Sequence, residues 1–201
     1  MDTRSKIIDG AAELFRKFGI KAVTMDMIAS HLSISKRTIY EIFSDKDELL
    51  AGVLSEMARK QKELGTKVLE ESGNTIEAIF RLIEINLDHL QTMSPGFNED
   101  MQRFYQNIKM RKEIKCEMPD YKNNQHIIKR GVKEKLFRKE INVDIVNRTL
   151  FSMVFNIMNF ELYPFEIFSR REVIKNTVIN YLRGIATPEG LEIIQKLEKK
   201  I

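Results

Sequence analysis

The chain has 201 residues, of which 43% are hydrophobic and 31% charged, and its formal net charge is +4. This length can bury a sizeable core, and the composition is that of a folded protein rather than a disordered one. The longest apolar run, residues 150–160, is interrupted by two asparagines and is too short for the roughly 20 residues of a membrane-spanning helix.

Positive charge is not concentrated at the N-terminus. Residues 1–50 hold eight Lys/Arg and eight Asp/Glu, whereas residues 101–144 hold twelve and six. Nucleic-acid binding by the N-terminal part must therefore depend on a few placed cations rather than on a broad basic surface. A single cysteine, Cys116, cannot form an intramolecular disulfide, and residues 1–8 lack the apolar core of a secretion signal. We therefore expect a cytoplasmic protein.

Apolar residues recur at helical spacing along almost the whole chain, without the alternation and hairpin signals of strands. This pattern predicts an all-α fold. The first expected helix begins near Thr3 and ends at Gly19, a residue suited to a left-handed C-terminal position. Its apolar stripe includes Leu14, Phe15 and Phe18.

Two short helices are expected next. Thr24 is the predicted N-cap of the second helix, and Ser35 that of a third, which runs to about Phe43. The remaining helices are expected at approximately residues 45–71, 74–94, 98–116, 121–136, 144–163, 169–185 and 190–201. Capping-box patterns mark three of these starts, at Asp45/Glu48, Asn74/Glu77 and Ser169/Glu172.

Residues 25–44 have the pattern of a helix, a tight turn and a second helix. Such a unit is too small to bury both faces, so the first helix must supply the missing wall through Leu14, Phe15 and Phe18. The outer side of the last helix is then free, and it carries Ser35, Lys36, Arg37, Thr38 and Tyr40. In a helix-turn-helix, the second helix lies in the major groove, while caps, cations and helix N-termini hold phosphates.

This unit resembles the TetR family of transcriptional regulators. The chain matches the family pattern at Thr24, Ile28, Ala29, Ser35, Lys36, Thr38, Ile39, Tyr40, Phe43, Lys46, Asp47, Glu48 and Leu49. It departs at Ser33, where the family usually has glycine, and at Arg37, where a small residue is frequent. A positive φ at Ser33 would cost about 1 kcal/mol. Arg37 adds a long cation that can pair with guanine in the major groove.

The resemblance implies a helix-turn-helix domain at 1–46 and a helical effector-binding and dimerisation domain at 47–201. The residues it assigns to DNA contact are Thr24, Ser35, Lys36, Arg37, Thr38, Tyr40 and Lys46. It also implies a homodimer that pairs through the helices at 144–163 and 169–185. Both helices are predicted to be apolar on more than one side, which is more surface than one neighbour can cover. A buried monomer core is the alternative explanation.

The resemblance further implies a cavity for an apolar or amphiphilic effector. Its candidate lining residues are Phe80, Ile83, Leu87, Met101, Phe104, Tyr105, Ile108, Tyr121, Phe151, Phe155 and Met158. Apolar side chains at helical spacing also build an ordinary core, so the pattern alone does not separate the two roles.

The expected function is a ligand-responsive transcriptional regulator, a repressor that binds a palindromic operator as a dimer and is released by its effector. No cofactor or metal is expected, because the three histidines are scattered and no phosphate-binding loop or nucleophile motif is present. The chain is therefore not expected to be an enzyme. The alternative is a helical small-molecule or lipid carrier without DNA binding, which leaves the cations around Tyr40 unexplained.

Overall fold

Helix is the regular structure of this protein. The computed structural model describes residues 2–91, 97, 100–101, 103–104, 124–157, 159 and 161–199. Among these residues no strand forms, and one isolated antiparallel bridge joins Phe137 to Ala186. The all-α prediction is confirmed. The expected helix at 98–116 lies largely outside the described residues.

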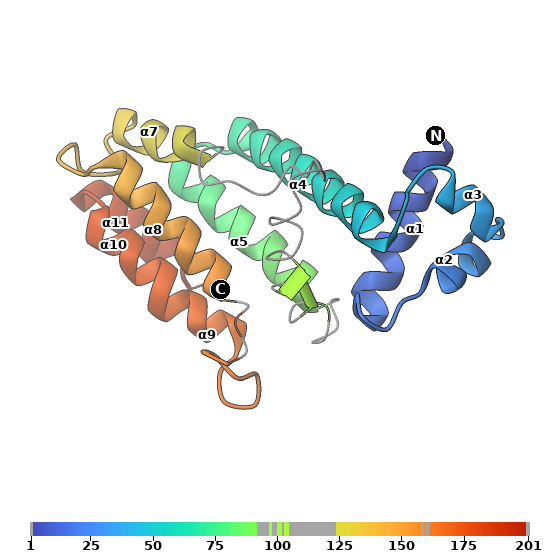
Figure 1. Cartoon of the computed structure of the whole chain (residues 1–201). Coiled ribbons are helices and arrows are strands. Elements are labelled where there is room, and N and C mark those ends of the chain that lie inside the picture. Colours follow the sequence, from blue (N-terminus) through green and yellow to red (C-terminus); the bar gives the residue numbers. More distant parts are fainter. Residues whose placement is uncertain are drawn as a thin grey trace. The chain divides into compact units, whose positions relative to one another are not determined.

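The helices follow one another in the order shown in Figure 1. They are α1 (Thr3–Phe18), α2 (Met25–Leu32), α3 (Lys36–Tyr40), α4 (Lys46–Glu71), α5 (Thr75–Gln91), α7 (Gln125–Lys133), α8 (Val143–Asn156), α9 (Arg170–Ile174), a π-helical turn (Lys175–Ile179), α10 (Asn180–Ile185) and α11 (Pro188–Leu197).

The chain forms two compact units. The first, called the head here, contains residues 1–61 and 91–118, and the second, called the body, contains residues 62–90 and 119–201. Helix α4 contributes to both. This division follows contacts in space, whereas the expected domain boundary at residue 46 follows the resemblance to the family. The expected boundary stays a prediction.

The predicted helix starts in both units are confirmed by side-chain caps. Thr24 accepts a hydrogen bond from the Met27 N–H at 3.2 Å, and Asp45 accepts one from the Glu48 N–H at 2.8 Å. The reciprocal capping-box bond differs from the expected pattern by one residue, because the Glu48 carboxylate accepts from the Ser44 N–H at 2.7 Å. The cap thus extends into the loop before α4.

The core of the head is built by α1–α3 together with the first half of α4. Phe15, Ile28, Ile39 and Phe43 are each at most 1% exposed within it. The expected contribution of Phe18 to this core is wrong, because that side chain is 47% exposed. Helix α1 ends at Phe18, and the residues after the positive-φ Gly19 fill the wall instead, with Ile20 and Val23 both fully buried.

The core of the body lies among α5, α7, α8 and the run from α9 to α11. Helix α8 packs against α7 and against the π-helical turn, and α10 packs against α11. The buried side chains at its centre include Ile76, Phe137, Ile179, Leu182 and Ile194. The predicted helix at 169–185 is confirmed as one continuous helical run that contains the π-helical turn.

The predicted helix at 144–163 is wrong at its C-terminal end, because α8 ends at Asn156. The Ile157 carbonyl accepts a hydrogen bond from the Arg170 guanidinium instead of closing a further helical turn. The Asn159 side chain then accepts from the Leu162 N–H at 2.9 Å and starts a new turn. Pro164 further disfavours helical backbone at the residue before it.

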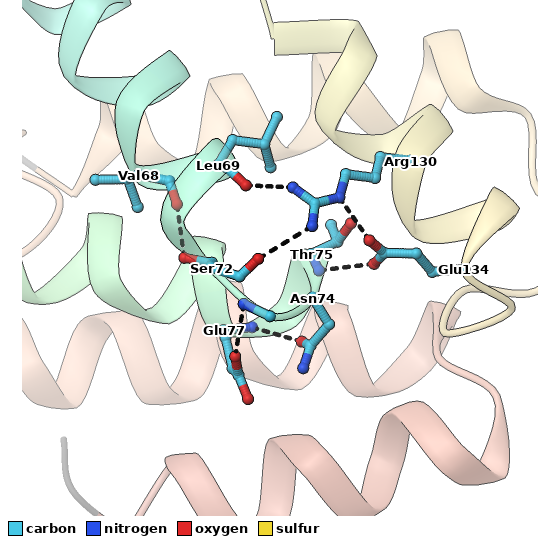
Figure 2. A network of polar contacts seen from close by, with 9 residues as sticks. Val68, Leu69, Ser72, Asn74, Thr75, Glu77, Arg130 and Glu134 are labelled. Carbon is cyan, nitrogen blue, oxygen red and sulfur yellow. Dashed lines mark hydrogen bonds and ion pairs between the residues drawn. The ribbon is translucent and has the colours of Figure 1, made fainter.

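A polar network joins the end of α4, the start of α5 and the end of α7 (Figure 2). The Arg130 guanidinium donates to the carbonyls of Leu69 and Ser72, and it also pairs with Glu134. The other Glu134 oxygen accepts from the Thr75 N–H at 2.7 Å. A cation thus meets the carbonyl end of α4 and a carboxylate meets the amide end of α5, which is the favourable polarity at both helix ends.

Candidate nucleic-acid interface

The turn between α2 and α3 is fixed by a left-handed residue. Ser33 has φ 53° and ψ 41°, and the next residue, Ile34, donates its N–H to the Ala29 carbonyl at 3.0 Å. These bonds close the C-terminus of α2 and redirect the chain sharply into α3. The expected positive φ at Ser33 is therefore confirmed, although the side chain carries the strain that glycine would avoid.

Helix α3 has one buried side and one exposed side. Ile39 is fully buried in the head core, whereas Tyr40 is 46% exposed and the Arg37 side chain is 88% exposed. Ser35 caps the helix by accepting from the Thr38 N–H at 3.0 Å, and the two hydroxyl oxygens lie 2.8 Å apart. The burial of one side fixes the helix, so its cations and tyrosine face solvent.

Both cations of α3 already pair with acids of the head. Lys36 Nζ lies 2.7 Å from an Asp26 oxygen on α2, and Arg37 Nε lies 2.9 Å from a Glu41 oxygen one turn further along. The hydrogen bond with Asp26 raises the pKa of Lys36 above its ordinary value, so this ammonium stays charged. Any anion that binds here must compete with these two carboxylates.

The predicted contact residues do not all share one environment. Thr24 and Ser35 are exposed caps, and Thr38 is half-buried. Lys46 is also half-buried, with its ammonium 6.0 Å from the centroid of the Phe15 ring. Burial lowers the pKa of Lys46, while the carboxylates of Asp100 and Asp47 act in the opposite direction. Lys46 is therefore less available to an external anion than the cations of α3.

Sequence reasoning missed the acids that pair with the α3 cations. The spacing of Arg37 and Glu41 by four residues is a readable signal for a helical ion pair. The pair between Lys36 and Asp26 joins two helices, and no local pattern reveals it. Sequence reasoning also missed Asp100, whose carboxylate accepts the Lys21 N–H at 2.6 Å within the head.

The predicted effector residues are distributed over both units. Phe80 and Leu87 are each 3% exposed in the body core, and Ile83 packs against that core. Met101 and Phe104 pack instead against the core of the head. Phe151 is half-buried and Phe155 is 49% exposed. Tyr105, Ile108, Tyr121 and Met158 lie outside the described residues, so the assignment of this set to one cavity stays a prediction.

Within the described ranges, no group of three His, Cys, Asp or Glu side chains is arranged to hold a metal ion. No described helix combines the length and apolar character required to cross a bilayer.

A helix, a left-handed turn and a second helix that buries Ile39 and exposes Lys36 and Arg37 define a helix-turn-helix domain, a class of DNA-binding fold. Residues 7–53 match the sequence profile of the family described as bacterial regulatory proteins, tetR family. The resemblance to this family is thus confirmed over these residues.

Relatives of known sequence carry related names. The chain is 30% identical over 97 residues to the uncharacterized HTH-type transcriptional regulator YhgD of Bacillus subtilis (strain 168), a match that covers 46% of this chain and 51% of YhgD. The chain thus spans about half the length of that relative. It is 26% identical over 153 residues to the HTH-type transcriptional repressor KstR2 of Rhodococcus jostii (strain RHA1), covering 73% of this chain and 74% of KstR2.

The fold also matches a solved structure along most of the chain. The structure of the ketosteroid transcriptional regulator KstR2 of Mycobacterium tuberculosis superposes with a TM-score of 0.56 at 19% identity. The match covers 92% of this chain and 96% of that one. At this identity the likeness concerns the fold.

Proposed function

We propose that the chain is a ligand-responsive transcriptional regulator that binds double-stranded DNA through α3 and involves neither catalysis nor a cofactor. The observation that carries the proposal is the division of α3 into a side locked by the fully buried Ile39 and a side that presents Lys36, Arg37 and Tyr40 to solvent. The match of residues 7–53 to the tetR family and the repressor name of KstR2 support the same role. A cytoplasmic location belongs to this proposal.

The proposed DNA contacts are of two kinds: contacts to phosphates, which position the protein on the duplex, and contacts to base edges, which recognise the sequence. Thr24, Ser35, Thr38, Tyr40 and Lys46 are proposed to hold phosphates, because hydroxyls and cations at helix starts suit that task. Lys36 and Arg37 are proposed to enter the major groove, where an Arg side chain can pair with guanine. To do so, each cation exchanges its carboxylate partner for DNA.

The regulator is proposed to act as a homodimeric repressor of a palindromic operator, since two copies place two α3 helices on successive half-sites. The helices at 144–163 and 169–185 are the regions proposed for pairing. An apolar or amphiphilic effector is proposed to release the operator, and the description of KstR2 as a ketosteroid regulator supports this class of ligand.

The proposed mechanism is linkage between effector and DNA. An effector that binds better to one spacing of the two α3 helices shifts the dimer away from the DNA-competent state. Helix α4 begins next to the helix-turn-helix and ends at the Arg130–Glu134 network, so it is the element proposed to carry the change. A 100-fold drop in operator affinity requires about 2.7 kcal/mol of coupling.

Replacement of Lys36, Arg37 and Tyr40 together by alanine tests the proposal. Genomic fragments from the encoding organism that the wild-type chain retains would serve as duplex probes, and binding would be measured by fluorescence anisotropy. We expect a loss of about 100-fold or more, because the variant lacks two cations and one phosphate contact. The thermal midpoint should hardly change, since all three side chains are exposed.

The matched control removes two exposed cations from α4 through Lys62→Ala and Lys67→Ala. This variant loses two positive charges, as the triple variant does, but should bind the probes nearly as well as the wild type. If the triple variant retained full affinity, the proposed interface would be wrong. The carrier alternative predicts that outcome together with unchanged small-molecule binding.

A further inference from the structure

The exposed side of α3 ends in an acid. Glu41 follows Tyr40 directly, and it is the only Asp or Glu between residues 27 and 44. Its backbone still has helical torsion angles, with φ −68° and ψ −21°, and its N–H donates to the Arg37 carbonyl at 2.9 Å. Glu41 therefore lies one turn beyond Arg37 on the same side of the helix.

Burial places Arg37 and Glu41 together on the solvent side of α3. Their side chains are 88% and 58% exposed, whereas Ile39 and Phe43 are at most 1% exposed in the core of the head. Tyr40, next to Glu41 in the sequence, is half-exposed. A surface that presents Arg37 to a duplex therefore presents Glu41 to the same duplex.

Arg37 and Glu41 are partners in the free protein. Arg37 Nε donates to Glu41 Oε1 at 2.9 Å, and the two residues have the four-residue spacing of a helical ion pair. Because both side chains are largely exposed, such a pair contributes little to the stability of the head. Stability alone therefore does not account for an acid on the side that is proposed to face DNA.

A carboxylate on this side is unfavourable next to most of a duplex. The phosphates place one negative charge per about 1.7 Å of the duplex axis. In the major groove, guanine and thymine present acceptors, and the donors are the amino groups of cytosine and adenine. Cytosine N4 is the established partner of Glu and Asp side chains there. A carboxylate in the groove thus weakens binding unless the sequence supplies an amino group.

We propose that Glu41 is a specificity-determining residue, which accepts a hydrogen bond from the N4 amino group of a cytosine while Arg37 pairs with a nearby guanine. This rests on the proposed function, because α3 must lie in the major groove. Both halves of the intramolecular pair are then replaced. Guanine O6 and N7 take the place of the carboxylate, and the cytosine amino group takes the place of the guanidinium.

The exchange selects a sequence because it requires both bases. A duplex that offers Arg37 only phosphates, or only a guanine, leaves the Glu41 carboxylate in the groove without a donor. An unpaired charge of this kind discriminates against the wrong partner. Four helical residues span about 6 Å, and successive bases of one strand lie about 3.4 Å apart. We therefore expect the cytosine within about two base pairs of the guanine.

Asp26, the partner of Lys36, offers a matched control on the same surface. Its carboxylate lies 2.7 Å from Lys36 Nζ and belongs to the first turn of α2. The first helix of a helix-turn-helix crosses the DNA backbone, where contacts carry no direct sequence information. Asp26→Asn should therefore strengthen binding to all duplexes by a similar factor. Like Glu41→Gln, it removes one negative charge and one ion pair with a cation of α3.

The test measures the base preferences of the wild type, Glu41→Gln and Asp26→Asn by fluorescence anisotropy at one salt concentration. The probes are a genomic duplex that the wild type retains, the same duplex with each base pair changed in turn, and a random duplex of equal length. In the wild type, changing the cytosine or the guanine should each weaken binding about 5- to 150-fold. Both acids are more than half exposed, so the thermal midpoints should hardly change.

Glu41→Gln should lose the preference for cytosine and keep the preference for guanine. Changing the cytosine should then cost about 2-fold or less, because the glutamine amide is uncharged and both donates and accepts. The random duplex should bind roughly 3- to 10-fold more tightly, since one repelled charge is gone. Asp26→Asn should keep both base preferences of the wild type.

A wild type without a preference for cytosine would overturn the proposal. A preference that persists in Glu41→Gln would also overturn it, as would a uniform loss of affinity in that variant, which would assign Glu41 to the helix alone.

The alanine triple variant at Lys36, Arg37 and Tyr40 separates this proposal from the proposed function. If the triple variant lost DNA binding while Glu41→Gln kept every base preference, the proposed function would stand and the role of Glu41 would fail. If the triple variant kept full affinity, both would fail.

Discussion

The backbone groups left unpaired at helix ends have partners close in sequence in the head, and partners distant in sequence at the α4–α5 junction of the body. In the head, Thr24 and Ser35 each cap a helix by accepting an N–H from three residues further on. In the body, the start of α5 has a local cap from Asn74, and in addition Arg130 of α7 and the next residue after that helix, Glu134, reach the end of α4 and the start of α5 from about sixty residues away along the chain. Local caps follow from the sequence, whereas the distant ones depend on how α7 packs.

The two arrangements also differ in what they connect. A local cap stabilises one helix and makes that helix independent of its neighbours. The Arg130–Glu134 pair makes the ends of α4 and α5 depend on the position of α7 (Figure 2). Disturbing the pair should therefore affect three helices, and disturbing a local cap only one.

Arg130→Met should produce the largest effect. It removes the guanidinium that donates to two backbone carbonyls and to Glu134, so these partly buried acceptors lose a hydrogen-bond donor. We expect a loss of about 2–3 kcal/mol in the free energy of unfolding, measured by urea denaturation. Arg148→Met removes an exposed helical ion pair with Asp144 and should cost far less. Equal losses would contradict the role of Arg130 at the junction.

Glu134→Gln should have the next largest effect, about 1–2 kcal/mol near pH 7, because the Thr75 N–H loses a charged acceptor. Burial acts to raise the pKa of Glu134, but the bonds from Thr75 and Arg130 outweigh it and hold the pKa below the ordinary value of 4.5. The wild type gains stability from this carboxylate above pH 4.5 and loses the gain as the pH falls through the lowered pKa.

The difference in urea midpoint between wild type and Glu134→Gln should therefore shrink from about pH 7 to about pH 3. A difference that stays constant over this interval would show that the carboxylate charge contributes nothing at the junction.

The local caps of the head should give smaller and separate effects. Thr24→Ala and Ser35→Ala should each cost about 1 kcal/mol, and hydrogen exchange should report the loss mainly in α2 and α3, respectively. If either substitution loosened the body helices as much as its own helix, the idea of independent caps would be contradicted.

The smallest effect should come from Ser33→Gly, which removes the backbone strain of a serine in the left-handed conformation. The strain that is removed exceeds the extra chain entropy of glycine, so we expect a gain of about 0.5 kcal/mol. Lys135, with φ 61°, offers the matching position in the body, and Lys135→Gly should give a similar gain. A loss at Ser33 with a gain at Lys135 would show that the Ser33 side chain has a role of its own.

Sequence predicted those parts of the fold that depend on neighbouring residues. The starts at Thr24, Ser35 and Asp45 are predictable because the capping side chain and the N–H that donates to it lie within one turn. The end of α8 was missed because Arg170, thirteen residues further on, takes the Ile157 carbonyl. The candidate interface was found from residue types, but the pair between Lys36 and Asp26 required the packing of α2 against α3.

The same pair affects how a duplex would bind. When Lys36 leaves Asp26 and enters the major groove, the duplex releases condensed counter-ions, but the Asp26 carboxylate, now without its partner, attracts a cation from solution. The two ion movements partly cancel, and the pair between Arg37 and Glu41 repeats the exchange. The salt dependence of DNA affinity should therefore be shallower than the slope of about 0.9 per phosphate contact expected for unpaired cations.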